Sequence, residues 1–353
     1  MVTFLPAMWG LDAPLARGKP YIKCYSNFSA SDWTHGAVVA RLAQKSKGGH
    51  NGIMTTLDHH PARLRRSVLC VPADNSRALA KVRQLAADAV IFDLEDAVAP
   101  EHKGEAREAL VRHLSKNRPD CEVVIRVNAL GSGFGQMDLT AALAASPDAI
   151  LLPKVESPAD IQVAVDWLAE NDAPESLRLW AMIETPRGLL NVAAIAETGR
   201  TFGGRLDCFV VGLNDLRKET RVPAHAGRTY LVPWLMQVLL TARSSGLDAI
   251  DAVFNDFRDA DGFEAECRQG RDMGYDGKML IHPAQIGPAN EHFGVDQAAV
   301  DEARAIIAAF DLPENADKGV INLHGRMVER LHLDQALKLA AKADMIEKRK
   351  AKP

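Results

Sequence analysis

The sequence predicts an α/β fold, a (β/α)₈ TIM barrel with a C-terminal helical lid segment. From residue 66 onward, short apolar runs alternate with helical patterns. Most runs are continuous rather than alternating, which is typical of parallel strands buried on both faces. Eight such repeats fit between about residues 66 and 310, the size of this barrel. A doubly wound open sheet is the alternative, but VPADNS after the first run is not its glycine-rich phosphate loop.

Each predicted strand is one apolar run. The runs are SVLCVP (67–72), AVIFDLED (89–96), EVVIRVN (122–128), AILLPKV (149–155), LRLWAMIET (177–185), CFVVGLND (208–215), LDAIDAVF (247–254) and GKMLIHP (277–283). The clearest helix patterns between them begin with a capping residue or a proline, or end in glycine, as helices commonly do. They cover residues 75–86, 158–171, 230–246 and 259–274.

Three segments are expected along the chain. Residues 1–62 mix Pro, Gly, Ser and Trp without periodicity, so they predict a poorly structured extension. A transit peptide is disfavoured because the first residues lack a basic region, and Met54 is favoured as the functional start. Residues 63–310 form the catalytic barrel. Residues 311–353 form a linker and lid, whose helical stretch 324–350 docks on its own barrel or on a neighbouring subunit.

Composition excludes several classes of protein. The 353 residues contain 42 Lys+Arg and 46 Asp+Glu, a net charge of −4, which argues against a nucleic-acid partner. No apolar stretch approaches the length of about 18 residues that a membrane span needs. The five cysteines form no CxxC pair, so we expect reduced thiols and a cytoplasmic protein.

Polar residues follow the predicted strands, where the active sites of such barrels lie. They are Asp93, Glu95, Asp96, Arg126, Asn128, Lys154, Glu156, Glu184, Asn214, Asp215 and His282. Carboxylates without zinc-type spacing suit Mg²⁺, and an arginine beside them suits an anionic substrate or a developing enolate. Structural alternatives stay open: Asp93 and Asp96 as caps, Glu184 at a helix N-terminus, Lys154 as a solvated loop cation and His282 as a packed loop residue.

Eight motifs, in order along residues 65–335, resemble the citrate lyase beta-subunit family of the HpcH/HpaI aldolase/citrate lyase superfamily, which includes malyl-CoA and citramalyl-CoA lyases. They are RRSVLCVPADNSRALAKV, VIFDLEDAVAPEHKGEAREAL, VIRVNALGSGFG, ILLPKVESPADI, AMIETPRGLLN, VVGLNDL, DAVFNDFRDADGF and GYDGKMLIHPAQIGPAN. The resemblance implies a Mg²⁺-dependent carbon–carbon lyase. Its substrate would be a 3-hydroxy-acyl-CoA of the citryl, malyl or citramalyl type, or the carrier-protein analogue, cleaved to an acyl-thioester and an oxo acid.

The resemblance also implies roles for individual residues. Glu184 and Asp215 would bind the metal, and Arg126 would be catalytic, holding the oxo-acid end and the thioester oxygen. The other substrate-binding residues it implies are Arg77, Lys81, Asp93, Glu95, Ile281 and His282. In this family a lid from a neighbouring subunit carries an aspartate. The matching run here, GRMVER, places the catalytic Glu329 at that position, so we expect a homotrimer or hexamer.

Two other functions remain open. One is a class II pyruvate aldolase acting on 4-hydroxy-2-oxo acids, which the CoA-side cations Arg77 and Lys81 disfavour. The other is a non-catalytic subunit of a carrier-protein lyase assembly. The sequence does not choose among the three acyl-CoA substrates, because one methylene in a pocket is worth only about 1–3 kcal/mol and leaves no motif.

Overall fold

The computed structural model describes residues 63–201 and 203–351. The chain divides into two units, Met1–Ile53 and Met54–Pro353, and the described residues belong to the second. The predictions for residues 1–62, including the start at Met54 and the thiol of Cys24, therefore lie outside the described residues. Among the helices that are described, none combines the length and the apolar character needed to cross a membrane.

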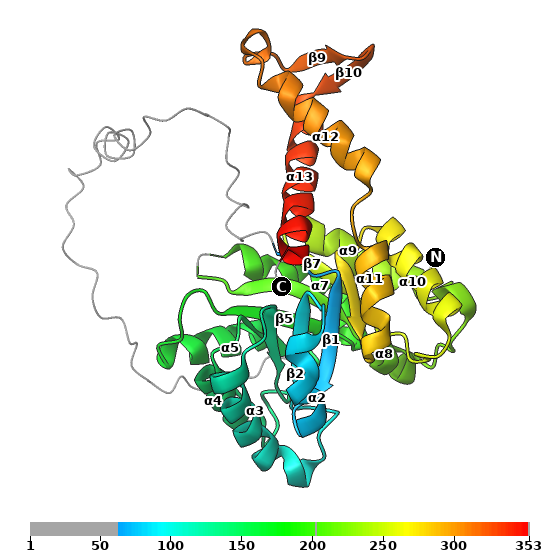
Figure 1. Ribbon diagram of the computed structural model, residues 1–353. Coiled ribbons are helices and arrows are strands. Elements are labelled where there is room, and N and C mark those ends of the chain that lie inside the picture. Colours follow the sequence, from blue (N-terminus) through cyan, green and yellow to red (C-terminus); the bar gives the residue numbers. More distant parts are fainter. Residues whose placement is uncertain (1–62, 202, 352–353) are drawn as a thin grey trace, which may run out of the picture. The chain divides into compact units, whose positions relative to one another are not determined.

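Eight parallel strands close into a barrel in the order in which they occur in the chain, which confirms the predicted fold (Figure 1). The last strand pairs with the first, with Val68 opposite Met279. The strands are β1 (Ser67–Pro72), β2 (Ala89–Asp93), β3 (Glu122–Arg126), β4 (Ala149–Leu152), β5 (Arg178–Ile183), β6 (Leu206–Val211), β7 (Asp248–Asp251) and β8 (Gly277–Leu280).

The strands are buried on both faces, as their continuous apolar runs predict. Side chains such as Ile91, Trp180 and Met182 fill the barrel interior. The alternate residues of the same strands, such as Phe92 and Ala181, form a larger core with the surrounding helices. At the closure, a side chain on Gly277 would lie 1.8 Å from the carbonyl oxygen of Arg65, so only glycine allows this approach.

Helices cover the outside of the barrel. They are α2 (Ser76–Lys81), α3 (Lys103–Asn117), α4 (Gly135–Ala145), α5 (Pro158–Glu170), α6 (Pro186–Leu190), α7 (Val192–Glu197), α8 (Leu213–Thr220), α9 (Val232–Ser244), α10 (Ala260–Met273) and α11 (Ile286–His292). Their starts follow sequence signals: the Asn75 side chain accepts the Ala78 N–H, and Ser157 and Asp160 form a capping box. Short 3₁₀ turns, among them η4 (Ala226–Arg228) and η5 (Pro283–Gln285), join several of them.

The C-terminal segment differs from the prediction of a continuous helix over 324–350. Strands β9 (Val320–Leu323) and β10 (Arg326–Glu329) form an antiparallel hairpin, and the helix α13 begins only at Arg330 and ends at Lys350. The turn residues His324 and Gly325 both have positive φ, +52° and +81°, which suits a two-residue hairpin turn. The helical interpretation was wrong here because it gave no weight to His-Gly as a turn signal.

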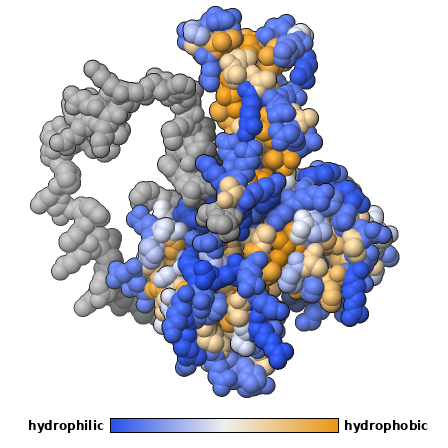
Figure 2. Space-filling model, viewed as in Figure 1, coloured by the Kyte–Doolittle hydropathy of each residue, from blue (hydrophilic) through white to orange (hydrophobic). Residues whose placement is uncertain are grey.

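Helix α12 (Gln297–Phe310) packs along α13 with the hairpin beyond them, and we call residues 297–351 the C-terminal extension (Figure 1). A small apolar core of Phe310, Ile321 and Val328 joins α12 to the hairpin. The prediction placed residues 297–310 with the barrel, whereas these contacts join them to the extension. Apolar side chains gather along the extension in Figure 2, and exposed ones include Met327.

The far end of α13 contacts the barrel at the amino ends of its strands. The Arg349 guanidinium donates to the carbonyl oxygens of Ala87 and Asp120, which precede β2 and β3. A helix of 21 residues is about 30 Å long, so the hairpin lies roughly that far from this contact. The extension therefore leaves the barrel from the end opposite to the carboxyl ends of the strands.

Candidate active site

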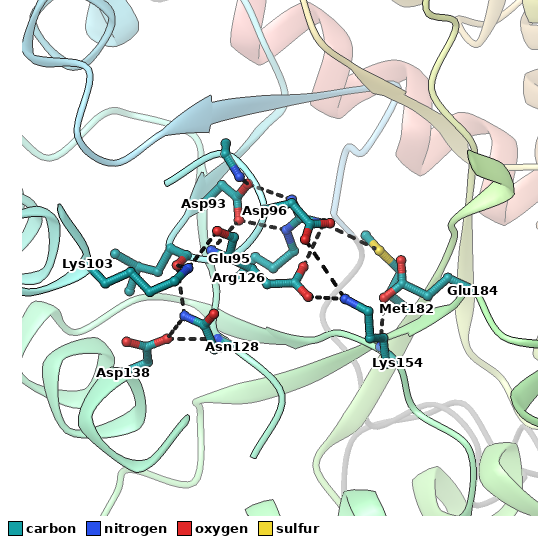
Figure 3. A network of polar contacts seen from close by, with 12 residues as sticks. Asp93, Glu95, Asp96, Lys103, Arg126, Asn128, Asp138, Lys154, Met182 and Glu184 are labelled. Atoms are coloured by element: carbon teal, nitrogen blue, oxygen red, sulfur yellow. Dashed lines mark hydrogen bonds and ion pairs between the residues drawn. The ribbon is translucent and has the colours of Figure 1, made fainter. Parts of the chain in front are cut away.

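Five charged side chains predicted from the strand ends meet at the carboxyl mouth of the barrel (Figure 3). They come from four neighbouring strands. Asp93 ends β2 and Glu95 follows it, Arg126 ends β3, Lys154 follows β4, and Glu184 follows β5. All but Lys154 are buried.

The carboxylate of Asp93 holds the guanidinium of Arg126 in place. Its Nε and Nη2 donate to the two carboxylate oxygens of Asp93 at 2.7 and 2.5 Å. The same oxygens also accept the N–H groups of Glu95 and Ala97, and Asp93 is fully buried. The resemblance placed Asp93 among the substrate contacts. In the structure its two oxygens accept four protein donors, an arrangement that positions Arg126, and its contact with substrate stays a prediction.

The same contacts occupy two of the three guanidinium nitrogens of Arg126. Nη1 alone is left at the mouth, 3.2 Å from Glu95 Oε2 and 3.8 Å from the sulfur of Met182. Burial lowers the pKa of Arg126, but the hydrogen bonds and charge of Asp93 outweigh it and raise the pKa above its ordinary value. Arg126 therefore stays cationic and presents one N–H edge to the mouth.

Glu95 lies between two cations. Its Oε1 accepts a hydrogen bond from the Lys154 ammonium, and its buried Oε2 has no hydrogen-bond donor among the described residues. Burial raises the pKa of Glu95 despite the nearby charges of Arg126 and Lys154. The partner of Oε2 at the mouth is the charge of the Arg126 guanidinium, whose Nη1 lies 3.2 Å away.

The loop that carries Glu95 is fixed by a second layer of polar contacts. The buried Lys103 ammonium donates to the carbonyl oxygens of Leu94 and Glu95 at 2.9 and 2.8 Å. Asn128 donates to Leu94 O at 2.8 Å and to a carboxylate oxygen of Asp138 at 2.5 Å. Asn128 is thus committed to the scaffold, although its place after a strand suggested a site residue.

Glu184 is the most enclosed carboxylate facing the mouth, with 1% of its surface exposed. Its Oε1 accepts the backbone N–H of Lys154 at 2.7 Å. A side chain on Gly212 would lie 2.8 Å from Glu184 Oε2, so glycine leaves the room that this carboxylate uses. Burial and then the negative charge of Glu95 raise the pKa of Glu184 to about 8.

Asp215 lies in the first turn of α8, three residues after Gly212. It is half-buried and makes no hydrogen bond or ion pair with the described residues. Among those residues no group of three or more His, Cys, Asp or Glu side chains has the arrangement of a metal site. Mg²⁺ commonly takes one or two carboxylates and fills its other positions with water and substrate oxygens. The unpaired Asp215 and the buried Glu184 fit that donor set.

Sequence reasoning placed Lys154 after a strand without a specific role, and the structure gives it two contacts at the mouth. Its backbone N–H binds Glu184 and its ammonium binds Glu95. Its φ is +50°, which is uncommon for a residue with a side chain. The sequence carries no signal for this conformation, because it is set by the neighbouring strands.

The remaining predicted contacts lie around the rim. Arg77 and Lys81 are exposed on α2 and have no partner among the described residues. Ile281 is exposed, and the ring of His282 stacks on Phe257 at 4.5 Å while its Nδ1 accepts the Ala284 N–H. Arg77, Lys81 and Ile281 are therefore accessible to a ligand.

Glu329 is not at the mouth of its own chain. It ends β10 and caps α13, where its backbone N–H donates to His332 Nδ1 at 2.9 Å. Because α13 meets the barrel at the end opposite the mouth, no described contact brings Glu329 to the mouth of its own chain.

The described cysteines are free thiols, as expected. Burial raises the pKa of Cys70 to about 12 and that of Cys121 to about 11. A thiol with a raised pKa is a poor nucleophile at neutral pH, so neither has the character of a catalytic cysteine.

Comparison with known proteins gives relatives that act on CoA thioesters. A (3S)-malyl-CoA thioesterase of Cereibacter sphaeroides is 43% identical over 288 residues, covering 81% of this chain and 97% of the relative. The mitochondrial citramalyl-CoA lyase of Homo sapiens is 33% identical over 302 residues, covering 82% and 89%.

A solved structure has the same fold. The protein CitE from Mycobacterium tuberculosis, in complex with magnesium, acetoacetate and coenzyme A, matches with a TM-score of 0.62 and 28% identity. The match covers 80% of this chain and 99% of CitE. The family described as HpcH/HpaI aldolase/citrate lyase matches residues 66–283. The barrel, the residues at its mouth and these matches show that the chain belongs to the HpcH/HpaI aldolase/citrate lyase family.

Proposed function

We propose that this protein is a Mg²⁺-dependent carbon–carbon lyase that cleaves a 3-hydroxy-acyl-CoA into an acyl-CoA and an oxo acid. The observation that carries the proposal is the mouth itself. There Asp93 holds Arg126 so that Nη1 faces the mouth beside Glu95, next to the enclosed carboxylate Glu184. Relatives named for malyl-CoA and citramalyl-CoA support a CoA thioester as substrate.

Glu184 and Asp215 would hold the metal. When bound there, Mg²⁺ would supply positive charge to the carboxylate and hydroxyl oxygens of the oxo-acid part of the substrate. Arg77 and Lys81 on α2 would bind the phosphates of CoA, and Ile281 and His282 would contact the substrate at the rim.

The cleavage is a retro-Claisen reaction. The hydroxyl proton leaves, the C–O bond becomes a carbonyl, and the adjacent C–C bond breaks. Its electron pair forms the enolate of the acyl thioester, which then takes up a proton. Nη1 of Arg126 would donate to the oxygen of that enolate, and one well-placed donor is worth about 3–4 kcal/mol in such reactions.

Hydrolysis of the thioester is a second candidate activity, favoured by the 43% identity to the malyl-CoA thioesterases. With (3S)-malyl-CoA the two activities give different products. Cleavage gives acetyl-CoA and glyoxylate, whereas hydrolysis gives malate and free CoA. A thiol reagent detects only the second reaction, and a hydrazone assay for glyoxylate detects only the first.

The test uses the full chain with citryl-, malyl- and citramalyl-CoA, in Mg²⁺ and in EDTA. We expect an oxo acid from at least one of them, in Mg²⁺ alone. Release of free CoA without an oxo acid would mean that the protein is a thioesterase and not a lyase. Turnover of 4-hydroxy-2-oxo acids, but of no thioester, would point to the aldolase. Turnover of a carrier-protein thioester alone would point to a subunit of a larger assembly.

We also propose that the working form is a homotrimer or hexamer, in which Glu329 reaches the mouth of a neighbouring copy. The direction in which the C-terminal extension leaves the barrel supports this arrangement. The exposed apolar residues Met327, Leu331 and Leu337 on it offer a surface for that neighbour. Light scattering of the full chain should give the mass of three or six copies, and a monomer would contradict the proposal.

A further inference from the structure

Lys154 is held at the mouth in a backbone conformation that its side chain disfavours. Its φ of +50° lies in the left-handed region, where residues with a side chain are uncommon. Such a conformation persists where the surroundings over-determine it, often at functional sites. Here the conformation directs the backbone N–H to Glu184 Oε1 at 2.7 Å.

The ammonium of Lys154 serves a different carboxylate from its backbone. It binds Glu95 Oε1 and lies 4.0 Å from Asp96 Oδ1. One residue therefore bridges Glu95 and Glu184, two buried carboxylates of like charge. Its side chain is 40% exposed, whereas that of Glu95 is 7% exposed.

The two cations at the mouth differ in their freedom to move. Arg126 is buried and tied to Asp93 by two hydrogen bonds. The side chain of Lys154 is flexible and reaches solvent. At the mouth its backbone N–H makes one hydrogen bond and its ammonium makes another. A further positive charge placed between Glu95 and Glu184 would repel both cations, and Lys154 is the one that can leave.

We propose that Lys154 is a positioning residue whose ammonium balances Glu95 and Glu184 until a divalent cation displaces it, and then binds the carboxylate of the oxo-acid part of the substrate. This inference rests on the proposed function and assigns a residue that neither the motifs nor the matches assign. The metal would bind Glu184 and Asp215, close to the Glu95 carboxylate that the ammonium binds, so the two positive charges repel and each weakens the binding of the other.

Three substitutions separate the ammonium from the backbone. Lys154→Gly removes the ammonium but suits the positive φ and keeps the N–H on Glu184. Lys154→Met removes the charge and keeps the strain, and Lys154→Arg keeps the charge. Lys116→Met on α3, an exposed lysine away from the mouth, is the matched control.

The experiment measures Mg²⁺ affinity by calorimetry, and thermal midpoints in EDTA, for the full chain. We expect Lys154→Gly and Lys154→Met to bind Mg²⁺ at least about fivefold more tightly than the parent. Both should have lower midpoints in EDTA, while Lys154→Arg and Lys116→Met match the parent. Glyoxylate binding in saturating Mg²⁺ should weaken at least about fivefold in Lys154→Gly.

The outcomes separate this inference from the proposed function. If the parent binds Mg²⁺ and the Gly and Met variants bind it equally or more weakly, the displacement is wrong and the proposed function stands. Unchanged glyoxylate binding in Lys154→Gly would overturn the substrate role. A parent that binds no Mg²⁺ would overturn both the metal dependence and the competition.

Discussion

Arg126 keeps its position through two hydrogen bonds to Asp93, and only Nη1 faces the mouth. Lysine keeps the charge but cannot bind Asp93 and reach the mouth at once. We expect Arg126→Lys to lower kcat/KM by about 100-fold or more. Asp93→Asn should also lower kcat/KM, because the guanidinium of Arg126 is then no longer held in position. Steady-state kinetics with the best thioester checks both, and near-normal turnover of Arg126→Lys would leave Arg126 a structural role.

Glu184 is a buried carboxylate beside another, Glu95, and that proximity is unfavourable without a cation. Glu184→Gln keeps the shape and removes the charge. In EDTA the variant should be more stable than the parent, by roughly 1–3 kcal/mol. In Mg²⁺ only the parent should gain stability. Denaturant unfolding in the two buffers checks this, and an equal Mg²⁺ gain in both proteins would remove Glu184 from the metal site.

The sequence predicts where these residues lie but not how each side chain is used. Asp93, Arg126 and Glu184 could be placed at one mouth because parallel strands share a carboxyl end. Whether a carboxylate faces the substrate or a neighbouring guanidinium depends on rotamers in the packed barrel. For that reason the sequence did not predict the hydrogen bonds between Asp93 and Arg126 or the left-handed backbone of Lys154.

At the scale of elements, one arginine ties several strands together at the amino end of the barrel. Arg65 precedes β1, and its guanidinium binds Glu122 of β3, Asp207 of β6 and Asp248 of β7. It also lies 4.7 Å from the ring centre of Trp180 in β5. A buried cation with these partners fixes how the strands meet.

We expect Arg65→Ala to lower the free energy of unfolding by about 3–5 kcal/mol, because it leaves buried carboxylates without their cation. Arg118→Ala is the control: Arg118 also binds an aspartate, Asp148, but at the exposed surface, so its loss should cost at most about 1 kcal/mol. Urea unfolding of both variants checks the prediction. Equal losses would mean that the inner ion pairs matter no more than a surface pair.

Asp248, at the start of β7, gives this end of the barrel a pH dependence. Burial and then the charge of Asp276 raise the pKa of Asp248 to about 6, although Arg65 opposes this. The folded protein thus holds the Asp248 proton at pH values where the unfolded chain has lost it, so this carboxyl lowers stability as the pH rises from about 4 to 6.

Asp248→Asn cannot ionise, so its stability relative to the parent should improve as the pH rises from 4 to 7. The side chain is about one-third exposed, so we expect a change of about 1 kcal/mol, smaller than for an enclosed group. Unfolding at four pH values between 4 and 7 checks the sign. A relative stability that stays flat or falls over this range would contradict the raised pKa.

The barrel elements could be predicted because each strand is a continuous apolar run, whereas the hairpin β9–β10 could not. Its strands are short and half-exposed, and Val328 is one of few buried residues in them. Apolar residues at such spacing also fit a helix face. The turn at His324–Gly325 is the one local signal that favours the hairpin.

In the whole molecule, the two ends of the barrel differ in what their charges do. At the amino end, Arg65 is enclosed by carboxylates that satisfy it. At the carboxyl end, Glu95 keeps a buried oxygen without a hydrogen bond, and Glu184 faces the like charge of Glu95. The first arrangement holds strands together. The second lowers stability without a ligand, as is common where binding or catalysis is the task.

The C-terminal extension carries Glu329 away from the mouth of its own chain. The family resemblance implies an aspartate at the position of Glu329, and the extra methylene of glutamate would shift the carboxylate by about an ångström. If Glu329 is the base that activates the water attacking the thioester carbonyl, hydrolysis should be slow relative to cleavage. Glu329→Asp should then raise hydrolysis and Glu329→Ala should abolish it, with cleavage assayed alongside. Two variants with parent-like rates in both reactions would leave the extension without a chemical role.

Mixed oligomers test whether Glu329 acts in a neighbouring copy. Arg126→Lys impairs the mouth, and Glu329→Ala impairs the extension, so each variant alone should hydrolyse slowly. Where the two chains assemble at random in equal amounts, a mouth with Arg126 meets an extension with Glu329 in about one quarter of the sites. Co-expressed chains should therefore recover about one quarter of the parent's hydrolysis. A mixture no more active than the mean of the two variants would show that mouth and extension are not exchanged between copies.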